Sequence, residues 1–403
     1  MRHRPALAAG VATAGLVGAG SLLAWRSGSP LVPRDGGTLD QGTAWPFLVL
    51  LVAAFCCYLV GLQLLRRAPS SARAVVVVAA LVQLVPLGAP LLLSTDAWTY
   101  WSYGWIAADG GGNPYVDPPS KFPQNPAVPY MGADWRDTTT VYGPAFTGLS
   151  EPVAKLAGTS SDTAAWLYKG LAAVAMLAAC VAVARTARRA ALAAAFVGWN
   201  PVLAVHAAGG GHNDALVGGL AALAVALALR RRHELSGAVW VAAVLVKWVP
   251  LLFLALSALA ARAHSRALGW RGVAAAAVGL GALSTWLYGL DWLRAAKPLA
   301  GNAARETSYA IPSRLESLGV PHGLALGVAF AGLAVGLALL ARGAVHGEAR
   351  LGLAACLVLV TTPYLAVWYL AWAVPLAAPE EERASRLVAL ALTAYLLPQT
   401  IPL

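Results

Sequence analysis

The sequence predicts an all-α protein that crosses a membrane many times, and its composition and the lengths of its apolar runs carry that prediction. Of the 403 residues, 59% are hydrophobic and only 12% are charged, whereas soluble domains carry about 25% charged residues. The apolar residues form runs of about 15–25, the length of a membrane helix, and not the short alternating segments of a membrane barrel. Backbone in hydrocarbon must satisfy its own hydrogen bonds, so a helical bundle follows.

The distribution of charge gives the third observation. The net charge is +11, but the arginines form short clusters between apolar runs. These clusters are Arg66–Arg67–Arg73, Arg185–Arg188–Arg189, Arg230–Arg231–Arg232, Arg262–Arg266–Arg271 and Arg342–Arg350. Such clusters follow the positive-inside rule and contact anionic lipid headgroups. Membrane lipids are therefore the expected partners of the basic residues, and nucleic acid is not.

Cysteine placement and the N-terminal segment agree with a membrane protein. The four cysteines lie inside apolar runs, where they are expected as small core residues without a disulfide or zinc spacing: Cys56, Cys57, Cys180 and Cys356. The first apolar segment follows Arg2 and Arg4 and resembles a signal peptide. It has no convincing small-residue cleavage site before Trp25, so we interpret it as an uncleaved first helix.

The apolar runs define the expected spans and a single domain covering residues 1–403. They occupy residues 6–25, 44–65, 74–93, 163–184, 190–208, 213–229, 235–261, 270–290, 322–341, 349–378 and 387–402. If the arginine clusters face the cytoplasm, the segments on the other side are 27–43, 94–162, 209–212 and 291–321. No repeat of about 20–50 residues is present.

Two of the runs need a break to keep their flanking arginines on one side. Run 235–261 has arginines at both ends, so we expect two half-helices hinged at Lys247–Trp248–Val249–Pro250, where proline removes a helical hydrogen bond. Run 349–378 is expected to split at Thr361–Thr362–Pro363–Tyr364, which places Arg383 and Arg386 inside. The sequence therefore predicts about 11–13 membrane segments.

The long segment 94–162 holds the densest polar chemistry, and such a segment is too long for a plain connector. Its first stretch carries Trp98, Tyr100, Trp101, Tyr103 and Trp105, which favour a helix at the membrane interface. Asp96 lies where a helix leaves the bilayer. A carboxylate beside apolar surface has its pKa raised and accepts protons as a general base. The alternative is that Ser94, Thr95 and Asp96 only cap the helix.

Two further motifs allow a structural and a functional interpretation. Tyr142–Gly143–Pro144 is a turn signal that returns the loop to the membrane. His212–Asn213–Asp214 opens an apolar run after Trp199–Asn200–Pro201. Polar groups at the start of a membrane helix are commonly functional, but Asn213 or Asp214 as an N-cap explains them equally. His212 and Asp214 are too few ligands for a metal site, so none is expected.

The segment 291–321 places cations on the side where the positive-inside rule does not favour them. Its charged residues are Asp291, Arg294, Lys297, Arg305, Glu306, Arg314 and Glu316. Guanidinium groups match phosphate oxygens, so a lipid-linked phosphate at headgroup level is one explanation and a solvated loop of mixed charge is the other. Trp368–Tyr369 stacks on a sugar ring or belongs to an aromatic belt.

Taken in order, these motifs resemble a family. Ser94-x-Asp96-x-x-x-Tyr100-x-x-x-Gly104, Gly112–Asn113–Pro114–Tyr115, Tyr142–Gly143–Pro144, Trp199–Asn200–Pro201, His212–Asn213–Asp214 and Trp368–Tyr369 are similar to motifs of the polyprenol-phosphomannose-dependent α-1,6-mannosyltransferases of actinobacteria, in the GT-C class. The resemblance extends from about Ser94 to Pro375. Each motif alone is weak, but their order and spacing together are fairly specific.

The resemblance implies a GT-C-type multi-helix fold with a long periplasmic first catalytic loop, in the cell membrane. It implies a polyprenyl-phosphate sugar donor, no metal or other cofactor, and an active site facing the periplasm. Asp96 would be the general base of an inverting transfer to a glycan or glycolipid hydroxyl. The expected substrate-binding residues are Tyr100, Tyr103, Asn113, Tyr115, Tyr142, His212, Asn213, Asp214, Arg294, Lys297, Arg305, Arg314, Trp368 and Tyr369. Segment 116–135 departs from the family, so the acceptor stays open.

Two alternatives remain at this point. In the first, the same scaffold transfers another sugar from polyprenyl phosphate, such as arabinofuranose or glucose. A lipid or sugar transporter or flippase would also have broken helices, but such proteins often show duplicated halves. This chain shows no duplication, and its ionisable residues gather outside the membrane segments.

Overall fold

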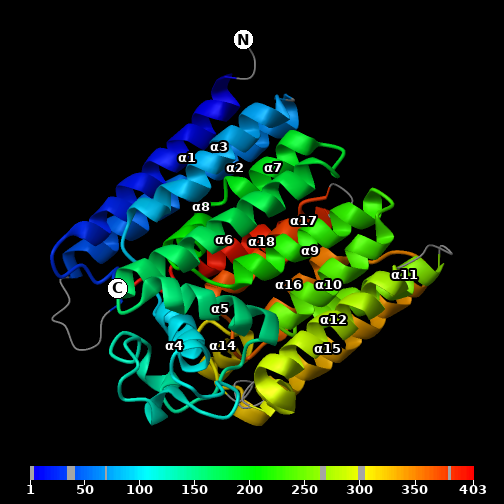
Figure 1. Cartoon of the computed structure of the whole chain (residues 1–403). Coiled ribbons are helices and arrows are strands. Elements are labelled where there is room, and N and C mark those ends of the chain that lie inside the picture. The colour runs from blue at the N-terminus through cyan, green and yellow to red at the C-terminus, as the bar shows by residue number, and fades with distance from the viewer. Residues whose placement is uncertain (1–3, 34–40, 69, 264–268, 298–304, 380–382) are drawn as a thin grey trace.

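A computed structural model describes the chain except residues 1–3, 34–40, 69, 264–268, 298–304 and 380–382 (Figure 1). Within the described ranges the protein is a bundle of helices joined by turns and loops, without a strand. The predicted all-α polytopic fold is confirmed. Most buried side chains belong to one continuous apolar core that extends from α1 to the last helix.

Long apolar helices run through the bundle. In the described part of the chain, five helices are long and apolar enough to cross a bilayer, some of them extended by a 3₁₀ turn. They are α1 (Arg4–Leu22) with η1 (Leu23–Trp25), α2 (Ala44–Arg67), α6 (Ser161–Ala184), α12 (Trp270–Tyr288) with η7 (Gly289–Ala295), and α15 (His322–Val345).

A sixth candidate span is bent. Helix α7 (Ala190–Gly198) continues through α8 (Pro201–Ala204) and the π-helical turn η6 (Val205–Gly209), with a bend of 49°. The bend lies at Trp199–Asn200–Pro201, where the Asn200 side chain accepts hydrogen bonds from the backbone N–H groups of residues 202 and 203. The motif therefore caps a helix, with proline at its first position.

Shorter helices fill the interior. They are α3 (Ala72–Leu84) with η3 (Val85–Gly88), α4 (Asp96–Ala108), α5 (Pro144–Ala157), α9 (Asp214–Leu229), α10 (His233–Val246), α11 (Pro250–Ala263), α14 (Ile311–Ser317), α16 (Leu351–Thr361), η8 (Val367–Tyr369) with α17 (Leu370–Ala377), and α18 (Arg383–Leu396). Single 3₁₀ turns are η2 (Gln41–Thr43), η4 (Pro119–Lys121) and η5 (Ala133–Trp135). Both expected breaks are present, between α10 and α11 and after α16. The total of 11–13 crossings stays a prediction.

The polar connecting segments meet at one end of the bundle, here called the loop end, in the lower part of Figure 1 around α4 and α14. Backbone hydrogen bonds join distant segments there: Leu93 N–H donates to the Leu31 carbonyl at 2.9 Å and Leu92 N–H to that of Gly209 at 3.0 Å. Asn113 Nδ2 donates to the Tyr288 carbonyl at 2.9 Å. The segments expected to share one membrane side are thus in contact.

The opposite end, called the arginine end, carries the arginine clusters that follow α2, α6, α9 and α15. Arg189 reaches the carbonyl of Arg66 there, at 3.5 Å. The separation of charge between the two ends fits the positive-inside rule.

Helix α4 is buried within the protein, and its expected position at the membrane interface stays a prediction. Trp98, Tyr100, Trp101 and Tyr103 are each at most 5% exposed. The helix packs so closely on α5 that a side chain at Gly104 would collide with the Ser150 backbone. The aromatic side chains of α4 therefore lie inside the protein and pack the helix against its neighbours.

A buried lysine anchors the chain just before α4. Lys169 of α6 has 0% exposure, and its Nζ donates to the carbonyls of Leu87, Ala89 and Pro90. A charged group within a membrane helix needs such partners. The contacts hold the segment that leads to Asp96.

Candidate active site

A cavity of about 250 Å³ opens at the loop end between α4, the α10–α11 break and the segment from α16 to α17. Four predicted site residues line it: Asp96, Tyr142, Trp368 and Tyr369. The other lining residues are Trp135, Val141, Lys247, Trp248, Val249, Val358, Thr362, Tyr364 and Trp372. The side chains of Asp96 and Lys247 thus line one cavity whose walls are largely aromatic. Ligand sites are typically such apolar pockets with a few convergent polar groups.

Asp96 is the first residue of α4, and its side chain is only 17% exposed. Its Oδ2 lies 3.2 Å from His212 Nδ1 and accepts a hydrogen bond from the Tyr100 hydroxyl at 3.3 Å. Neither Asp96 nor Thr95 makes a capping side-chain bond to the helix; the Asp96 N–H instead donates to Ser94 Oγ. The capping interpretation of Asp96 is therefore wrong.

The pKa of Asp96 differs from the expected direction. Burial acts to raise the pKa of this carboxyl, as anticipated, but its interactions with His212, Lys247 and Tyr100 outweigh burial and bring the pKa below its ordinary value. The expectation of a raised pKa was wrong because it took no account of His212, just before α9, and Lys247, just after α10. Asp96 is a carboxylate at neutral pH, the form that accepts a proton.

A second carboxylate, Asp214, holds the cation of the cavity. Asp214 is 1% exposed, and its Oδ1 lies 2.7 Å from Lys247 Nζ and accepts a hydrogen bond from Trp372 Nε1, also at 2.7 Å. The Lys247 ammonium lies over the rings of Tyr369 and Trp372, at 4.7 and 5.2 Å from their centroids. These contacts orient Lys247 toward the cavity and identify Asp214 as the group that positions it.

His212 and Asn213 complete the network around Asp96. The His212 ring stacks on Trp368 with centroids 3.9 Å apart and an interplanar angle of 12°. Asn213 Oδ1 accepts a hydrogen bond from the Tyr100 hydroxyl at 3.3 Å and makes no capping bond to α9. The side chains of the His212–Asn213–Asp214 triplet therefore contact Asp96, Tyr100 and Lys247 and do not cap α9.

Gly143 explains why the Tyr142–Gly143–Pro144 turn lies against α10. Its N–H donates to the Val246 carbonyl at 3.0 Å, and any side chain at this position would collide with the Leu245 carbonyl. This close approach sets Tyr142 of the first loop beside Lys247. The turn therefore has a structural role: it holds the first loop against α10, and these two segments form two sides of the cavity.

Three predicted substrate-binding residues lie outside the cavity lining and bind protein groups. Tyr103 donates to the Thr138 carbonyl at 2.8 Å. Tyr115 is buried, and its hydroxyl is 3.1 Å from the Tyr142 carbonyl and 3.0 Å from Thr147 Oγ1. Asn113 ties the first loop to the segment that follows α12. These residues shape the loop end.

Of the four predicted phosphate-binding cations, Arg305 lies against a cavity-lining side chain: its guanidinium is 4.8 Å from the ring centroid of Trp135. Arg294 is 65% exposed and paired with Asp291 at 3.0 Å. Arg314 donates to the Tyr395 hydroxyl at 3.0 Å, and Lys297 is exposed. The structure does not bring these three to the cavity.

Lys247 is the principal site residue that the sequence interpretation missed. The sequence places it at the expected hinge of run 235–261, and a lone cation within an apolar run is itself a signal of function. Trp135, Tyr364 and Trp372 were also absent from the predicted site. They are single aromatic residues in an aromatic-rich sequence, and only the packing of distant segments distinguishes them.

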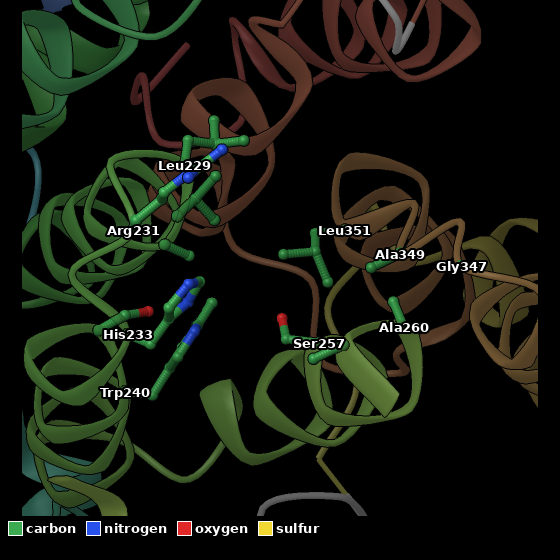
Figure 2. A pocket seen from close by; sticks show the side chains of 13 residues that line it. Leu229, Arg231, His233, Trp240, Ser257, Ala260, Gly347, Ala349 and Leu351 are labelled. Atoms are coloured by element: carbon green, nitrogen blue, oxygen red, sulfur yellow. The ribbon is translucent and has the colours of Figure 1, made fainter. Parts of the chain in front are cut away.

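Larger cavities lie elsewhere. One of about 800 Å³ at the arginine end is lined by residues such as Arg231, His233, Trp240 and Ser257, without a carboxylate among its lining residues (Figure 2). At the loop end, Glu306, Glu316 and His322 offer ligand atoms within 4.8 Å of one another, but His322 is already paired with both carboxylates.

Two family models match the chain. The model described as "Alpha-(1->6)-mannopyranosyltransferase, N-terminal domain" matches residues 5–263. The model of glycosyltransferase family 87 matches residues 140–398. Each match covers more than half of the sequence, and the two overlap in the region that contains Lys247, His212 and Asp214. The chain shows no significant similarity to a solved structure.

Curated relatives are actinobacterial. The chain is 30% identical over 169 residues to Alpha-(1->6)-mannopyranosyltransferase A of Corynebacterium glutamicum, covering 40% of this chain and 34% of the relative. It is 28% identical over 365 residues to a Mycolicibacterium smegmatis protein named as a probable alpha-(1->6)-mannopyranosyltransferase, covering 72% and 62%. A Mycobacterium tuberculosis alpha-(1->6)-mannopyranosyltransferase is 30% identical over 151 residues, covering 35% and 25%.

The matched regions thus span between a quarter and about three fifths of these relatives' lengths. The matches nevertheless agree with one another and with the all-helical membrane fold. The family model alone covers residues 5–263, which include the motifs from Asp96 to Asp214. The chain belongs to the alpha-(1->6)-mannopyranosyltransferase family of actinobacterial membrane glycosyltransferases.

Proposed function

We propose that this chain transfers mannose from a polyprenyl-phosphate carrier to a hydroxyl of a glycan or glycolipid acceptor, in the cavity between Asp96 and Lys247. The observation that carries the proposal is the presence of both groups in one aromatic-walled cavity of about 250 Å³. A base and a fixed cation facing each other are what glycosyl transfer from a phosphate requires.

The acceptor hydroxyl attacks the anomeric carbon of the sugar while the bond from that carbon to the phosphate oxygen breaks. Asp96 takes the proton of the hydroxyl, and the electron pair of the broken bond leaves on the polyprenyl phosphate. Direct displacement inverts the anomeric centre, so a β-linked donor yields an α-linked product. General-base assistance of this kind contributes about 10²–10⁴-fold.

Lys247 supplies the positive charge for the leaving phosphate. Its Nζ is held by Asp214 and by two aromatic rings, so it needs little reorganisation when negative charge develops. Arg305, over the Trp135 ring at the same cavity, is the second candidate. Trp368, Tyr369 and Trp372 form an aromatic wall on which the apolar face of a sugar ring stacks.

The protein is a multi-pass membrane protein, and we propose that the loop end faces the periplasm. The arginine clusters at the other end support this orientation through the positive-inside rule. The donor and acceptor would then meet the cavity at the outer headgroup level of the cell membrane.

The proposal is tested with purified protein, polyprenyl-phosphate mannose and an α-mannoside acceptor. Asp96→Asn removes the base with little change in shape, and we expect turnover to fall about 10²–10⁴-fold. Asp109→Asn is the matched control, because Asp109 is an exposed carboxylate at the other end of α4. Turnover of Asp96→Asn near the wild-type rate would remove Asp96 from this role.

The same assay separates the alternatives. Transfer from polyprenyl-phosphate arabinofuranose or glucose, but not mannose, would keep the mechanism and change the donor. Movement of a labelled polyprenyl-phosphate sugar across vesicles without any acceptor would instead identify a flippase.

A further inference from the structure

The cavity of about 800 Å³ at the arginine end lies between the two half-helices α10 and α11. His233 and Trp240 line it from the side of α10, and Ser257 and Ala260 line it from the side of α11 (Figure 2). Arg231, in the turn that precedes α10, lies at its edge. The proposed reaction uses none of these residues.

A second hollow, of about 690 Å³, adjoins this cavity. The two spaces share the residues that line them where they meet: Val225, Leu229, Gly347, Ala349 and Leu351. The second hollow is lined further by apolar side chains of α16 and α17, by Arg383, and by Arg350, which is paired with Glu348. Two adjoining apolar spaces beside cationic groups match the two acyl chains and the phosphate of a phospholipid.

The helix ends around the two spaces place them at one membrane surface. Helix α9 ends at Leu229, α10 begins at His233, α11 ends at Ala263, α15 ends at Val345 and α16 begins at Leu351. The arginine clusters that the positive-inside rule assigns to one face of the membrane adjoin these ends. An apolar space between helices excludes water, which finds too few hydrogen-bond partners there. In a membrane, the chains of a lipid are the apolar groups that reach such a space.

Arg231 adopts a backbone conformation that favours glycine. Its φ is 61°, in the left-handed region that residues with a side chain rarely adopt. The turn ends α9 in the Schellman pattern: the Arg232 N–H donates to the Leu227 carbonyl at 2.9 Å and the Arg231 N–H to that of Ala228 at 3.0 Å. Glycine is the usual residue at the position of Arg231. An arginine there strains the turn, and a ligand for its guanidinium explains the strain.

The donors at the cavity have no acidic partner. Arg231 makes no ion pair or side-chain hydrogen bond with the residues that the structure describes. Trp240 is 1% exposed and packs on the Phe253 ring, and its Nε1 makes no hydrogen bond within the described ranges. The neighbouring Glu234 carboxylate accepts a hydrogen bond from the Gly272 N–H on α12. A guanidinium and a buried indole N–H are thus available to the oxygens of an anion.

Two helix N-termini add positive potential at the same place. His233 is the first residue of α10 and Leu351 the first residue of α16, and both line the cavity. Neither helix start has a side-chain cap, so its first N–H groups attract negative charge. The lining of the 800 Å³ cavity contains no carboxylate that would repel a phosphate.

We infer that an anionic phospholipid of the membrane leaflet at the arginine end occupies these two adjoining spaces. Its phosphate lies at Arg231, near the starts of α10 and α16, and one acyl chain fills each space beside Leu229 and Leu351. The lipid joins α9, α10, α11 and α16 and stabilises the bundle at the end opposite Asp96. The inference does not depend on the proposed reaction.

Lipid binding to the detergent-purified full chain tests the inference without a sugar substrate. Dioleoyl-phosphatidylglycerol is compared with dioleoyl-phosphatidylcholine, which has the same acyl chains and no net charge. Native mass spectrometry counts the lipid that stays bound, and thermal unfolding is followed as the lipid concentration rises. We expect the wild type to retain phosphatidylglycerol and to unfold at a higher temperature in its presence, with a smaller effect of phosphatidylcholine.

Arg231→Gly separates the lipid contact from the turn. Glycine favours the positive φ of this position, so without lipid we expect the variant to unfold at the wild-type temperature or above it. We expect it to bind phosphatidylglycerol at least about tenfold more weakly, because a hydrogen bond to a charged group is lost. Arg67→Ala is the matched control, since Arg67 is an exposed arginine at the same end and lines neither space.

Ser257→Phe tests the acyl-chain part of the site. The added ring enters the 800 Å³ cavity from α11 and takes the place of the lipid chain. We expect this variant to fold, to lose the thermal shift with phosphatidylglycerol and to retain less of that lipid than the wild type.

Three results would overturn the lipid site. One is wild-type affinity for phosphatidylglycerol in Arg231→Gly, and another is an equal loss in Arg67→Ala, which would mean attraction by surface charge in general. The third is stabilisation by glycerol 3-phosphate alone that equals that of the lipid, which would show a site for a soluble phosphate. Lipid binding that depends on Arg231, in a protein that transfers no mannose, would keep the site and reject the proposed reaction.

Discussion

The two ends of the bundle differ in what their polar groups contact. At the loop end, the polar groups Asp96, His212, Asp214 and Lys247 are held by one another and by aromatic rings around a cavity. At the arginine end, the 800 Å³ cavity of Figure 2 is larger but has no carboxylate among its lining residues. The candidate site is thus distinguished by buried, paired opposite charges and not by cavity size.

The physical reason is desolvation. Buried charges persist only when they are paired and hydrogen-bonded, so each one at the loop end has an identifiable partner. Arginines at the membrane surface keep their water and their lipid headgroups and need no protein partner. We propose that charge at the arginine end orients the chain in the membrane and that charge at the loop end serves the reaction.

Substitution of Lys247 should give the largest difference in activity between the two ends of the bundle. Replacement of Lys247 by Gln should lower kcat about 10²–10³-fold, the usual loss when one stabilising donor is removed from a site. Because this change leaves Asp214 buried and unpaired, the double variant Lys247→Gln/Asp214→Asn is measured as well. We expect it to fold and still to lose transfer.

The control for Lys247 is Lys155→Gln, at the exposed end of α5. Near-normal turnover by the double variant would show that the Lys247–Asp214 pair stabilises the fold without acting on the donor.

Gly143→Ala tests whether the close approach of the first loop to α10 aligns the cavity. The added Cβ collides with the Leu245 carbonyl, so the loop or the helix must move. A displacement of about 1 Å in a catalytic arrangement costs roughly 10²-fold, and we expect a loss of that order in kcat. Gly170→Ala, at a helical position of α6 where an added Cβ meets nothing within 4 Å, is compared for thermal stability. Unchanged turnover in Gly143→Ala would argue against this alignment.

His212→Gln tests whether His212 lowers the pKa of Asp96. In the native protein the pKa of Asp96 lies below its ordinary value, so the carboxylate is present above that pKa and activity is lost as pH falls through it. Without His212, burial still raises the pKa and less opposes it. The acid limb of kcat/KM against pH should therefore move to higher pH, with a smaller loss at neutral pH than for Lys247→Gln. An unmoved acid limb would contradict the pairing of Asp96 with His212.

Arg231→Ala should have the smallest effect. Arg231 lines the cavity at the arginine end and belongs to a cluster of three, so its neighbours keep the orientation signal. Exposed substitutions usually change stability by less than about 0.5 kcal/mol, and we expect kcat to stay within about twofold. A loss comparable with that of Lys247→Gln would give the arginine end a direct part in catalysis.

The sequence by itself determined the class of fold and the places where helices break. The apolar runs match the long helices, and Pro250 and the Thr361–Tyr364 stretch mark breaks that the structure contains. These features are local: a helix in lipid needs a certain length, and proline removes a hydrogen bond wherever the chain goes. The motifs also indicated the family before any spatial information was available.

Only the tertiary structure decided which residues share the site. Asp96 and His212 are over a hundred residues apart, as are Asp96 and Lys247, and no local rule measures the distance between them. In the packed structure, Asn113 and Tyr115 bind protein groups, and Arg294 and Arg314 lie away from the cavity. The neighbours of Asp96 lower its pKa, where the sequence predicts a raised pKa. A pKa and a binding site depend on neighbours through space, and the fold alone supplies those neighbours.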